Sequence, residues 1–236
     1  MQPKYKRVLL KLSGEALARE KNKGILDDAF LDRVAAVVAR CVADGVEVAV
    51  IVGAGNIWRG RQGAGMDRTR GDTMGMLATT INAIALQDAF LRAGVDTRVM
   101  SALQMPAVAE FFTRDVALAH LKAGRAVVFA GGTGHPYFST DTAAALRAIE
   151  IEADVILMAK NIDGIYTADP RVDATAVRLD SLRYADILEK NLRAVDLTSA
   201  ALCMENALPT LVFGLDNPEN IWHAVCGEVV GTLITA

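Results

Sequence analysis

Residues 46–55 read Val-Glu-Val-Ala-Val-Ile-Val-Gly-Ala-Gly, an apolar run that ends in glycines. Such a run is typical of a strand that is buried on both faces, as the strands of parallel sheets are. The same order returns in the runs Val8-Leu9-Leu10-Lys11-Leu12 and Ala126-Val127-Val128-Phe129-Ala130, which lead to Gly14 and Gly131. Since ligands of such sheets bind beyond the carboxyl ends of the strands, the three glycine-containing loops are predicted to form a site there.

Helical patterns separate the predicted strands. Apolar residues recur at helical spacing from Leu31 to Val42, behind Asp27 or Asp28 as N-cap and before Gly45. We predict further helices at about 72–92, 114–122, 141–152, 184–192, 197–206 and 218–225, and further strands at 97–100, 155–158, 210–213 and 232–234. This alternation predicts an α/β protein with a mainly parallel sheet covered on both faces. Composition does not change near residue 151, so two lobes on one continuous sheet are expected within a single domain, 1–236.

Composition excludes several classes of protein. The 236 residues are 52% hydrophobic and 22% charged, which is globular, and 25 Lys and Arg against 28 Asp and Glu give a net charge of −3. A generally basic nucleic-acid coat is excluded, whereas anionic small molecules are not. No membrane contact is expected, because no run approaches about 20 apolar residues. Cys41, Cys203 and Cys226 are far apart, which favours buried thiols in the cytoplasm over disulfides.

The first two loops carry cations and glycines. Lys11-Leu12-Ser13-Gly14 can offer one ammonium group and several N–H groups to a phosphate, or Lys11 can simply extend its ammonium group from the core to water. Residues 53–60 match neither the dinucleotide pattern G-x-G-x-x-G nor the Walker pattern. The basic residues after Gly53 indicate either a nearby anion or a solvated charged loop: Arg59, Arg61, Arg68 and Arg70.

The later loops are rich in hydroxyl and carboxylate groups. Residues 131–141 combine three glycines with Thr133, Ser139 and Thr140 before a predicted helix, which suits either a phosphate or ordinary helix capping. Tyr166 could stack on a base or fill the core, and Asp196 is by default an N-cap. Taken in order, these loops favour phosphoryl transfer, in which the protein mainly positions two anions and neutralises charge.

Five ordered motifs carry a resemblance to a known family. They are Lys11-Leu12-Ser13-Gly14-Glu15, Gly53-x-Gly55-Asn56-x-x-Arg59-Gly60, Gly71-Asp72-x-Met74-Gly75-Met76, Gly131-x-Thr133-Gly134-x-Pro136-Tyr137-Phe138-Ser139-Thr140-Asp141 and Asp163-Gly164-x-Tyr166-x-x-Asp169-Pro170. Together they resemble the bacterial uridylate (UMP) kinases of the amino-acid-kinase superfamily over essentially the whole chain.

The resemblance implies a three-layer αβα sandwich and the reaction ATP + UMP → ADP + UDP in pyrimidine nucleotide biosynthesis. It implies Mg²⁺ with ATP, a cytoplasmic homohexamer, a UMP-binding lobe at about 1–150 and an ATP-binding lobe at about 151–236. Nucleotides could act as effectors of such a protein, with inhibition by UTP and activation by GTP. Binding to nucleic acid is not expected.

Residue by residue, the resemblance implies four groups of site residues. The catalytic residues are Lys11, Arg59, Asp141 and Asp196, of which Asp141 and Asp196 are the candidates for Mg²⁺. ATP would contact Lys11, Leu12, Ser13, Gly14, Gly55, Arg59, Lys160, Asn161, Tyr166 and Asp169. UMP would contact Ala54, Asp72, Thr133, Gly134, His135, Pro136, Tyr137, Phe138, Ser139 and Thr140.

The chain departs from the family pattern in three places. Ala54 replaces the usual third glycine, and Lys160 or Asn161 stands where the family often has threonine, so which of the two contacts ATP stays open. Residues 18–24 lack the glycine-rich stretch of many GTP-activated members.

Two rival functions remain open at this point. The same fold phosphorylates carboxylates or carbamate, against which the Asp72 motif and residues 133–140 favour a nucleotide acceptor. A nucleotide-sensing oligomer that binds nucleic acid or protein is disfavoured as the main role by the acidic net charge and by the intact set Lys11, Arg59 and Asp169.

Overall fold

A computed structural model describes residues 1–18, 24–58, 65–170, 172–173, 175–189 and 195–236. These residues form a nine-stranded central sheet in the order β4 (Glu110–Phe111), β3 (Thr97–Ser101), β5 (Ala126–Ala130), β2 (Glu47–Val52), β1 (Arg7–Leu12), β6 (Val155–Lys160), β10 (Thr210–Gly214), β11 (Gly231–Thr235) and β9 (Ser181–Arg183). β11 runs antiparallel to β10, and the other described pairs in this sheet are parallel. The predicted mainly parallel α/β sheet is therefore confirmed.

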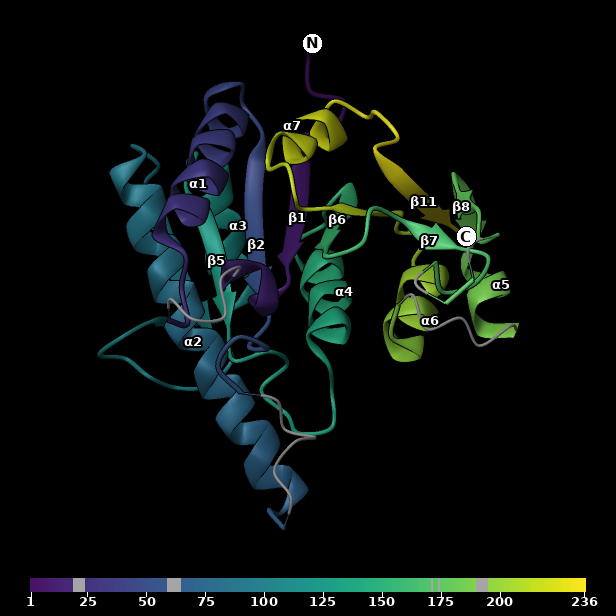
Figure 1. The fold of residues 1–236 in the computed structure, drawn as a ribbon. Helices are drawn as coiled ribbons and strands as arrows, with labels where there is room; N and C mark the ends of the chain where they lie inside the picture. Colours follow the sequence, from purple (N-terminus) through teal and green to yellow (C-terminus); the bar gives the residue numbers. More distant parts are fainter. Residues whose placement is uncertain (19–23, 59–64, 171, 174, 190–194) are drawn as a thin grey trace.

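Helices cover both faces of the sheet (Figure 1). Alternate strand residues such as Val8 and Leu10 pack under α1 (Asp28–Ala43), α2 (Arg68–Arg92) and α7 (Glu219–Val225). The residues between them, such as Leu9, face α3 (Arg114–Lys122), α4 (Thr140–Glu150), α5 (Tyr184–Glu189) and α6 (Leu197–Glu205). Two apolar cores, one on each side, give the three layers that the sequence resemblance implied.

The chain enters the sheet at its middle. β1 pairs with β2 on one side and with β6 on the other. The strands that follow β1 in the sequence are therefore added first on the β2 side of the sheet and later on the β6 side. Such a reversal leaves a crevice at the carboxyl ends of the strands, which is where ligands bind in sheets of this kind. The sheet runs without interruption from the strands before residue 150 to those after it.

Helix α2 begins earlier than the sequence analysis predicted, at Arg68 instead of Asp72. Asp67 is its N-cap, and the Asp67 side chain accepts a hydrogen bond from Arg70 N. Arg68 and Arg70 therefore belong to the first turn of α2 and not to the preceding loop. Asp27 and Ser139 cap α1 and α4 in the same way.

Several short elements carry no periodicity and were not predicted. They are the 3-10 turn η1 (Gly14–Leu17), the strands β4 and β9, and the hairpin of β7 (Ile165–Tyr166) and β8 (Arg178–Leu179). The predicted end of α5 at residue 192 lies outside the described residues.

By length and composition alone, α2 is long and apolar enough to cross a membrane, although the sequence analysis expected no such segment. Half of its most apolar stretch is buried inside the protein, however, and α2 is a core helix of the fold. The cysteines are free; Cys41 and Cys203 are buried as expected, whereas Cys226 is half-buried. Burial raises the pKa of the Cys41 thiol to about 12.

Candidate active site

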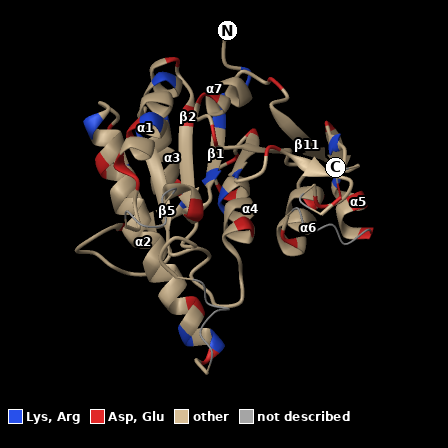
Figure 2. Cartoon of the chain, viewed as in Figure 1, with Lys and Arg blue, Asp and Glu red and all other residues tan. Residues whose placement is uncertain are grey.

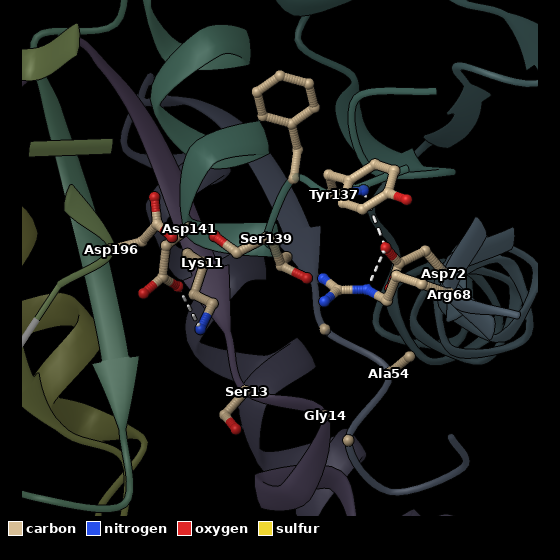
Figure 3. A pocket seen from close by; sticks show the side chains of 14 residues that line it. Lys11, Ser13, Gly14, Ala54, Arg68, Asp72, Tyr137, Ser139, Asp141 and Asp196 are labelled. Carbon is tan, nitrogen blue, oxygen red and sulfur yellow. Dashed lines mark hydrogen bonds and ion pairs between the residues drawn. The ribbon is translucent and has the colours of Figure 1, made fainter. Parts of the chain in front are cut away.

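A cavity of about 590 Å³ opens at the carboxyl edge of the sheet, where the chain reverses its direction across the sheet. Its walls come from the ends of β1 and β2, from the first turn of α2, from residues 137–141 and from Asp196 (Figure 3). Segments far apart in sequence meet there because the parallel strands all end at this edge. The cavity is polar on one side, with Lys11, Asp141 and Asp196, and carries a second charged group around Asp72 across from it.

Two lysines share the carboxylate of Asp141. Lys11 Nζ lies 2.9 Å from Asp141 Oδ1, and Lys160 Nζ lies 3.4 Å from Asp141 Oδ2. The three side chains are only 10%, 16% and 21% exposed for Lys11, Asp141 and Lys160. Water therefore screens their charges weakly, and each charge has a strong effect on its neighbours.

The pKa values of this group follow from that geometry. Burial opposes ionisation of Asp141, but Lys11 and Lys160 outweigh it and hold the pKa of this carboxyl well below its usual range. Burial, together with Lys11, lowers the pKa of Lys160, and Asp141 opposes that decrease. The Asp141 carboxylate is therefore ionised at neutral pH.

Asp196 is fixed by its role as a cap. One of its carboxylate oxygens accepts from Ser199 N at 3.1 Å, as the N-cap of α6, and from the Thr142 hydroxyl at 2.8 Å. The predicted N-cap is confirmed, and the capping bonds bring the carboxylate to the cavity wall beside Asp141.

Asp72 is the centre of the second charged group. Its Oδ2 accepts from Arg68 Nε at 2.7 Å and from Tyr137 N at 2.9 Å, and the Arg68 guanidinium lies over the Tyr137 ring. Tyr137 has φ of 73°, in the left-handed region that costs a residue with a side chain about 1–2 kcal/mol. The bond to Asp72 holds the loop in this conformation and joins it to α2 (Figure 3).

The glycine loop after β2 packs directly on the loop after β1. A Cβ atom at Gly14 would lie 2.5 Å from Gly53 O and 2.6 Å from Gly55 N, so only glycine fits without a backbone shift. Asn82, fully buried in α2, donates to Gly53 O at 2.8 Å and pairs with Asn56 through both side-chain amides. These contacts set the position of the loop backbone at Gly53 and Gly55, which lines the cavity.

A smaller cavity of about 220 Å³ adjoins the first and shares six lining residues with it: Ala54, Gly55, Asp72, Phe138, Ser139 and Thr140. Its remaining walls come from Trp58, Gly75, Met76, Thr79, Gly132, Thr133 and His135. The Thr79 hydroxyl of α2 also accepts a hydrogen bond from Gly131 N, which attaches the loop after β5 to α2. The two cavities therefore adjoin at the loop after β2 and at residues 138–140.

The structure brings most of the predicted site residues to these two cavities. Leu12 is buried in the core, Pro136 and Gly134 line neither cavity, and Arg59 lies outside the described residues. Lys160 reaches the site through Asp141, while Asn161 Nδ2 donates to Glu15 Oε2 at 3.4 Å. Tyr166 belongs to β7 of the two-stranded hairpin, where its hydroxyl donates to Asp163, and neither Tyr166 nor Asp169 lines the two cavities.

Sequence reasoning missed the pairing of Arg68 with Asp72 and the cavity-lining role of Trp58, Met76 and Thr79. Asp67 is a good N-cap residue, and a helix started there would have placed Arg68 and Asp72 one turn apart. Met76 stands in one of the five motifs, but nothing in the sequence assigns Met76 or Thr79 to a cavity wall, because this depends on which face of α2 meets the loop after β5.

The described residues contain no group of three or more His, Cys, Asp or Glu side chains that could hold a metal ion. Asp141 and Asp196 both line the larger cavity, and one or two carboxylates suffice for Mg²⁺ that is held mainly by nucleotide phosphates and water. The residues present therefore fit an ion that arrives with a nucleotide.

A mainly parallel sheet with lysine- and glycine-containing loops at its carboxyl edge is an arrangement that α/β proteins use to bind phosphate groups. The family model described as the amino acid kinase family matches residues 6–214, and the chain belongs to this family.

Solved structures agree with this assignment over nearly the full length of the chain. A UMP kinase from Bacillus anthracis superposes with a TM-score of 0.94 at 37% identity, covering 98% of this chain and 96% of that one. A UMP kinase from Ureaplasma parvum gives 0.92 at 33% identity and full coverage of both chains. A uridylate kinase from Archaeoglobus fulgidus gives 0.73 at 33% identity, covering 96% and 99%.

Proposed function

We propose that the protein is a UMP kinase that transfers the γ-phosphoryl group of ATP to UMP, giving UDP and ADP. The similarity at 33–37% identity and over at least 96% of the chain to solved UMP kinases carries this proposal. The two adjoining cavities support it, because a donor and an acceptor must lie in contact for direct transfer. The lobe of residues 1–150 would bind UMP, and residues 151–236 would bind the adenosine part of ATP.

The proposed reaction is an in-line attack by a UMP phosphate oxygen on the γ-phosphorus of ATP, with ADP leaving. A phosphate monoester has a second pKa of about 6, so the attacking oxygen is already ionised at neutral pH and needs no general base. The obstacle is the repulsion between two polyanions. Lys11, the loop N–H groups and, by resemblance, Arg59 would offset it and align the reacting groups.

Each end of the site would hold one nucleotide. Asp72, held by Arg68 and Tyr137 N, is placed to accept from the ribose hydroxyls of UMP, with Thr133 and Thr140 beside the base and phosphate. Tyr166 and Asp169 would lie near the adenine and ribose of ATP. Mg²⁺, if bound with ATP, would be held by the nucleotide phosphates with Asp141 and Asp196 and would supply further charge neutralisation.

A coupled assay of ADP release tests the proposal. With ATP and Mg²⁺, we expect turnover with UMP, weaker turnover with CMP, and none with N-acetylglutamate or carbamate. Cytosine presents an amino group where uracil has a carbonyl oxygen, which leaves buried polar groups unpaired in a site built for uracil. Equal kcat/KM values for UMP and CMP would contradict this view of the base site, and preference for a carboxylate or carbamate would contradict the function.

We also propose that the protein self-associates in the cytoplasm, as the homohexamer that the sequence resemblance implies. The outward side of α2 carries an apolar stripe at spacings of 3, 4, 3 and 7 residues: Met74, Leu77, Ile81, Ile84 and Leu91, each 39–49% exposed. The middle of this helix shows no charge in Figure 2. A self-complementary stripe of this kind fits the same stripe of a second copy. Inhibition by UTP and activation by GTP stay predictions.

A further inference from the structure

The row Lys11, Asp141 and Lys160 places two ammonium groups on one carboxylate. β1 and β6 are neighbouring parallel strands, and Lys11 stands opposite Met158 in their register. Side chains two residues apart lie on the same face of a strand, so Lys160 rises on the same face as Lys11, under α4. Asp141 in the first turn of α4 meets both lysines, at 2.9 Å and 3.4 Å.

The two lysines differ in their relation to the cavity. Lys11 and Asp141 line the 590 Å³ cavity, whereas Lys160 is not among its lining residues. The Lys160 ammonium therefore holds Asp141 from outside the cavity, on the carboxylate oxygen that Lys11 does not use. A ligand in the cavity would meet Lys11 and Asp141 first.

This arrangement decides the charge that a phosphate group would meet. Lys11 and Asp141 alone form a neutral pair, in which the carboxylate cancels the ammonium and repels an anion. With Lys160, two positive charges offset the carboxylates of Asp141 and of the neighbouring Asp196, whereas without Lys160 this group of side chains would carry a net charge of −1. Because all three side chains are largely buried, this difference is felt strongly across the few ångströms to the cavity.

We propose that Lys160 is a positioning residue for the donor phosphates: it neutralises Asp141 from outside the cavity and so leaves the charge of Lys11 to the terminal phosphates of ATP. The inference rests on the proposed function for the identity of the donor, ATP, but not for that of the acceptor.

Binding measurements without an acceptor test this inference. Affinities for a non-hydrolysable ATP analogue with Mg²⁺ and for AMP are measured by calorimetry on the full chain. We expect Lys160→Met to weaken the analogue about tenfold, which corresponds to the loss of one partly screened charge, and to weaken AMP less. Lys160→Arg should restore most of the affinity, and the exposed Lys122→Met should bind like the wild type.

A double-mutant cycle with Asp141→Asn separates an indirect from a direct role. If Lys160 acts by neutralising Asp141, Lys160→Met should have little effect, within about twofold, once the Asp141 charge is gone. An equal loss in both backgrounds would mean that Lys160 binds phosphate itself and would overturn the inference. Equal losses for the analogue and AMP, or no rescue by arginine, would also overturn it, because they indicate a packing role.

Folding and function are checked separately. Thermal unfolding by circular dichroism shows whether each variant is folded, and Lys160→Gln takes the place of Lys160→Met if the latter is not. If the wild type binds the ATP analogue but does not phosphorylate UMP, the proposed function fails while the cycle still decides the role of Lys160.

Discussion

Lys11 is the cation that the sequence predicts for the phosphates and that the structure places at the larger cavity. It is the buried lysine that lines the larger cavity, at the end of the central strand β1. We predict that Lys11→Ala lowers kcat for UMP phosphorylation by roughly 10²-fold, as expected for the loss of one charge-stabilising group, while the fold persists. Steady-state kinetics beside circular dichroism measure this. Near-normal kcat would remove Lys11 from the mechanism, and Lys122→Ala is the matched control.

Gly14 is required by a close approach of two loops, not by its backbone angles. An alanine methyl group there would meet the backbone at Gly53 and Gly55 at 2.5–2.6 Å. We predict that Gly14→Ala destabilises the protein by about 1–3 kcal/mol, the usual cost of overpacking, and impairs nucleotide binding. Gly75→Ala is the control, since its methyl group would meet Trp58 at an ordinary 3.8 Å within a helix. Equal unfolding free energies for both variants would contradict the prediction.

Asp141 links stability to pH. Its carboxyl has a lowered pKa in the folded protein, so its stabilising effect is complete above the unfolded value of about 4 and is lost as the pH falls further. We predict that Asp141→Asn lowers the unfolding free energy by roughly 1–3 kcal/mol at pH 7, because it removes the carboxylate charge that both lysines contact. The difference from wild type should shrink below about pH 4. A difference that is constant from pH 7 to pH 3.5, measured by urea unfolding, would argue against this role.

At the scale of elements, α2 has a separate task on each side. Its inward side anchors the loops that line the two cavities, through Asp72, Thr79 and Asn82. Its outward side carries the apolar stripe described above. A helix that is apolar on both sides has no clear amphipathic pattern, which is why the sequence predicted its existence but not which side faces the core.

The apolar stripe on the outward side of α2 predicts that a charged side chain placed there weakens self-association. We expect Ile81→Glu, at a side chain that is 47% exposed, to weaken self-association by placing a carboxylate in the contact, without unfolding the protein. Sedimentation velocity measures the assembly. Val116→Glu, on α3 and 40% exposed, introduces the same charge elsewhere and should assemble like the wild type. If both variants sediment alike, the stripe is not the contact.

For the whole molecule, the continuous sheet predicts how the protein unfolds. Both apolar cores combine residues from before and after position 150, such as Leu10 with Trp222 on one side and Leu9 with Tyr184 on the other. We therefore expect one cooperative transition at fixed protein concentration. The two tryptophans report on the two halves, so fluorescence of Trp58→Phe and Trp222→Phe should give matching urea midpoints. Clearly separate midpoints would show that the halves unfold independently.

The sequence by itself determined the parallel α/β architecture and the place of the site. Short, mostly apolar runs that end at glycines favour strands buried on both faces, and the glycines after them mark the edge where a ligand binds. It also predicted Asp196 as a cap and narrowed the cap of α1 to Asp27 or Asp28, because capping depends on a few neighbouring residues. All of these properties depend on residues that are close to one another in the sequence.

Only the tertiary structure decided the contacts between distant segments. The register between β1 and β6 places Lys160 within 3.4 Å of Asp141. The rotation of α2 about its axis places Asp72, which is paired with Arg68, within hydrogen-bonding distance of Tyr137 N. The same rotation chose Thr79 and Asn82 for the inward side and left Ile81 outside. Such contacts depend on the packing of whole elements, in which small shifts in register or rotation exchange one neighbour for another, and no local pattern in the sequence encodes them.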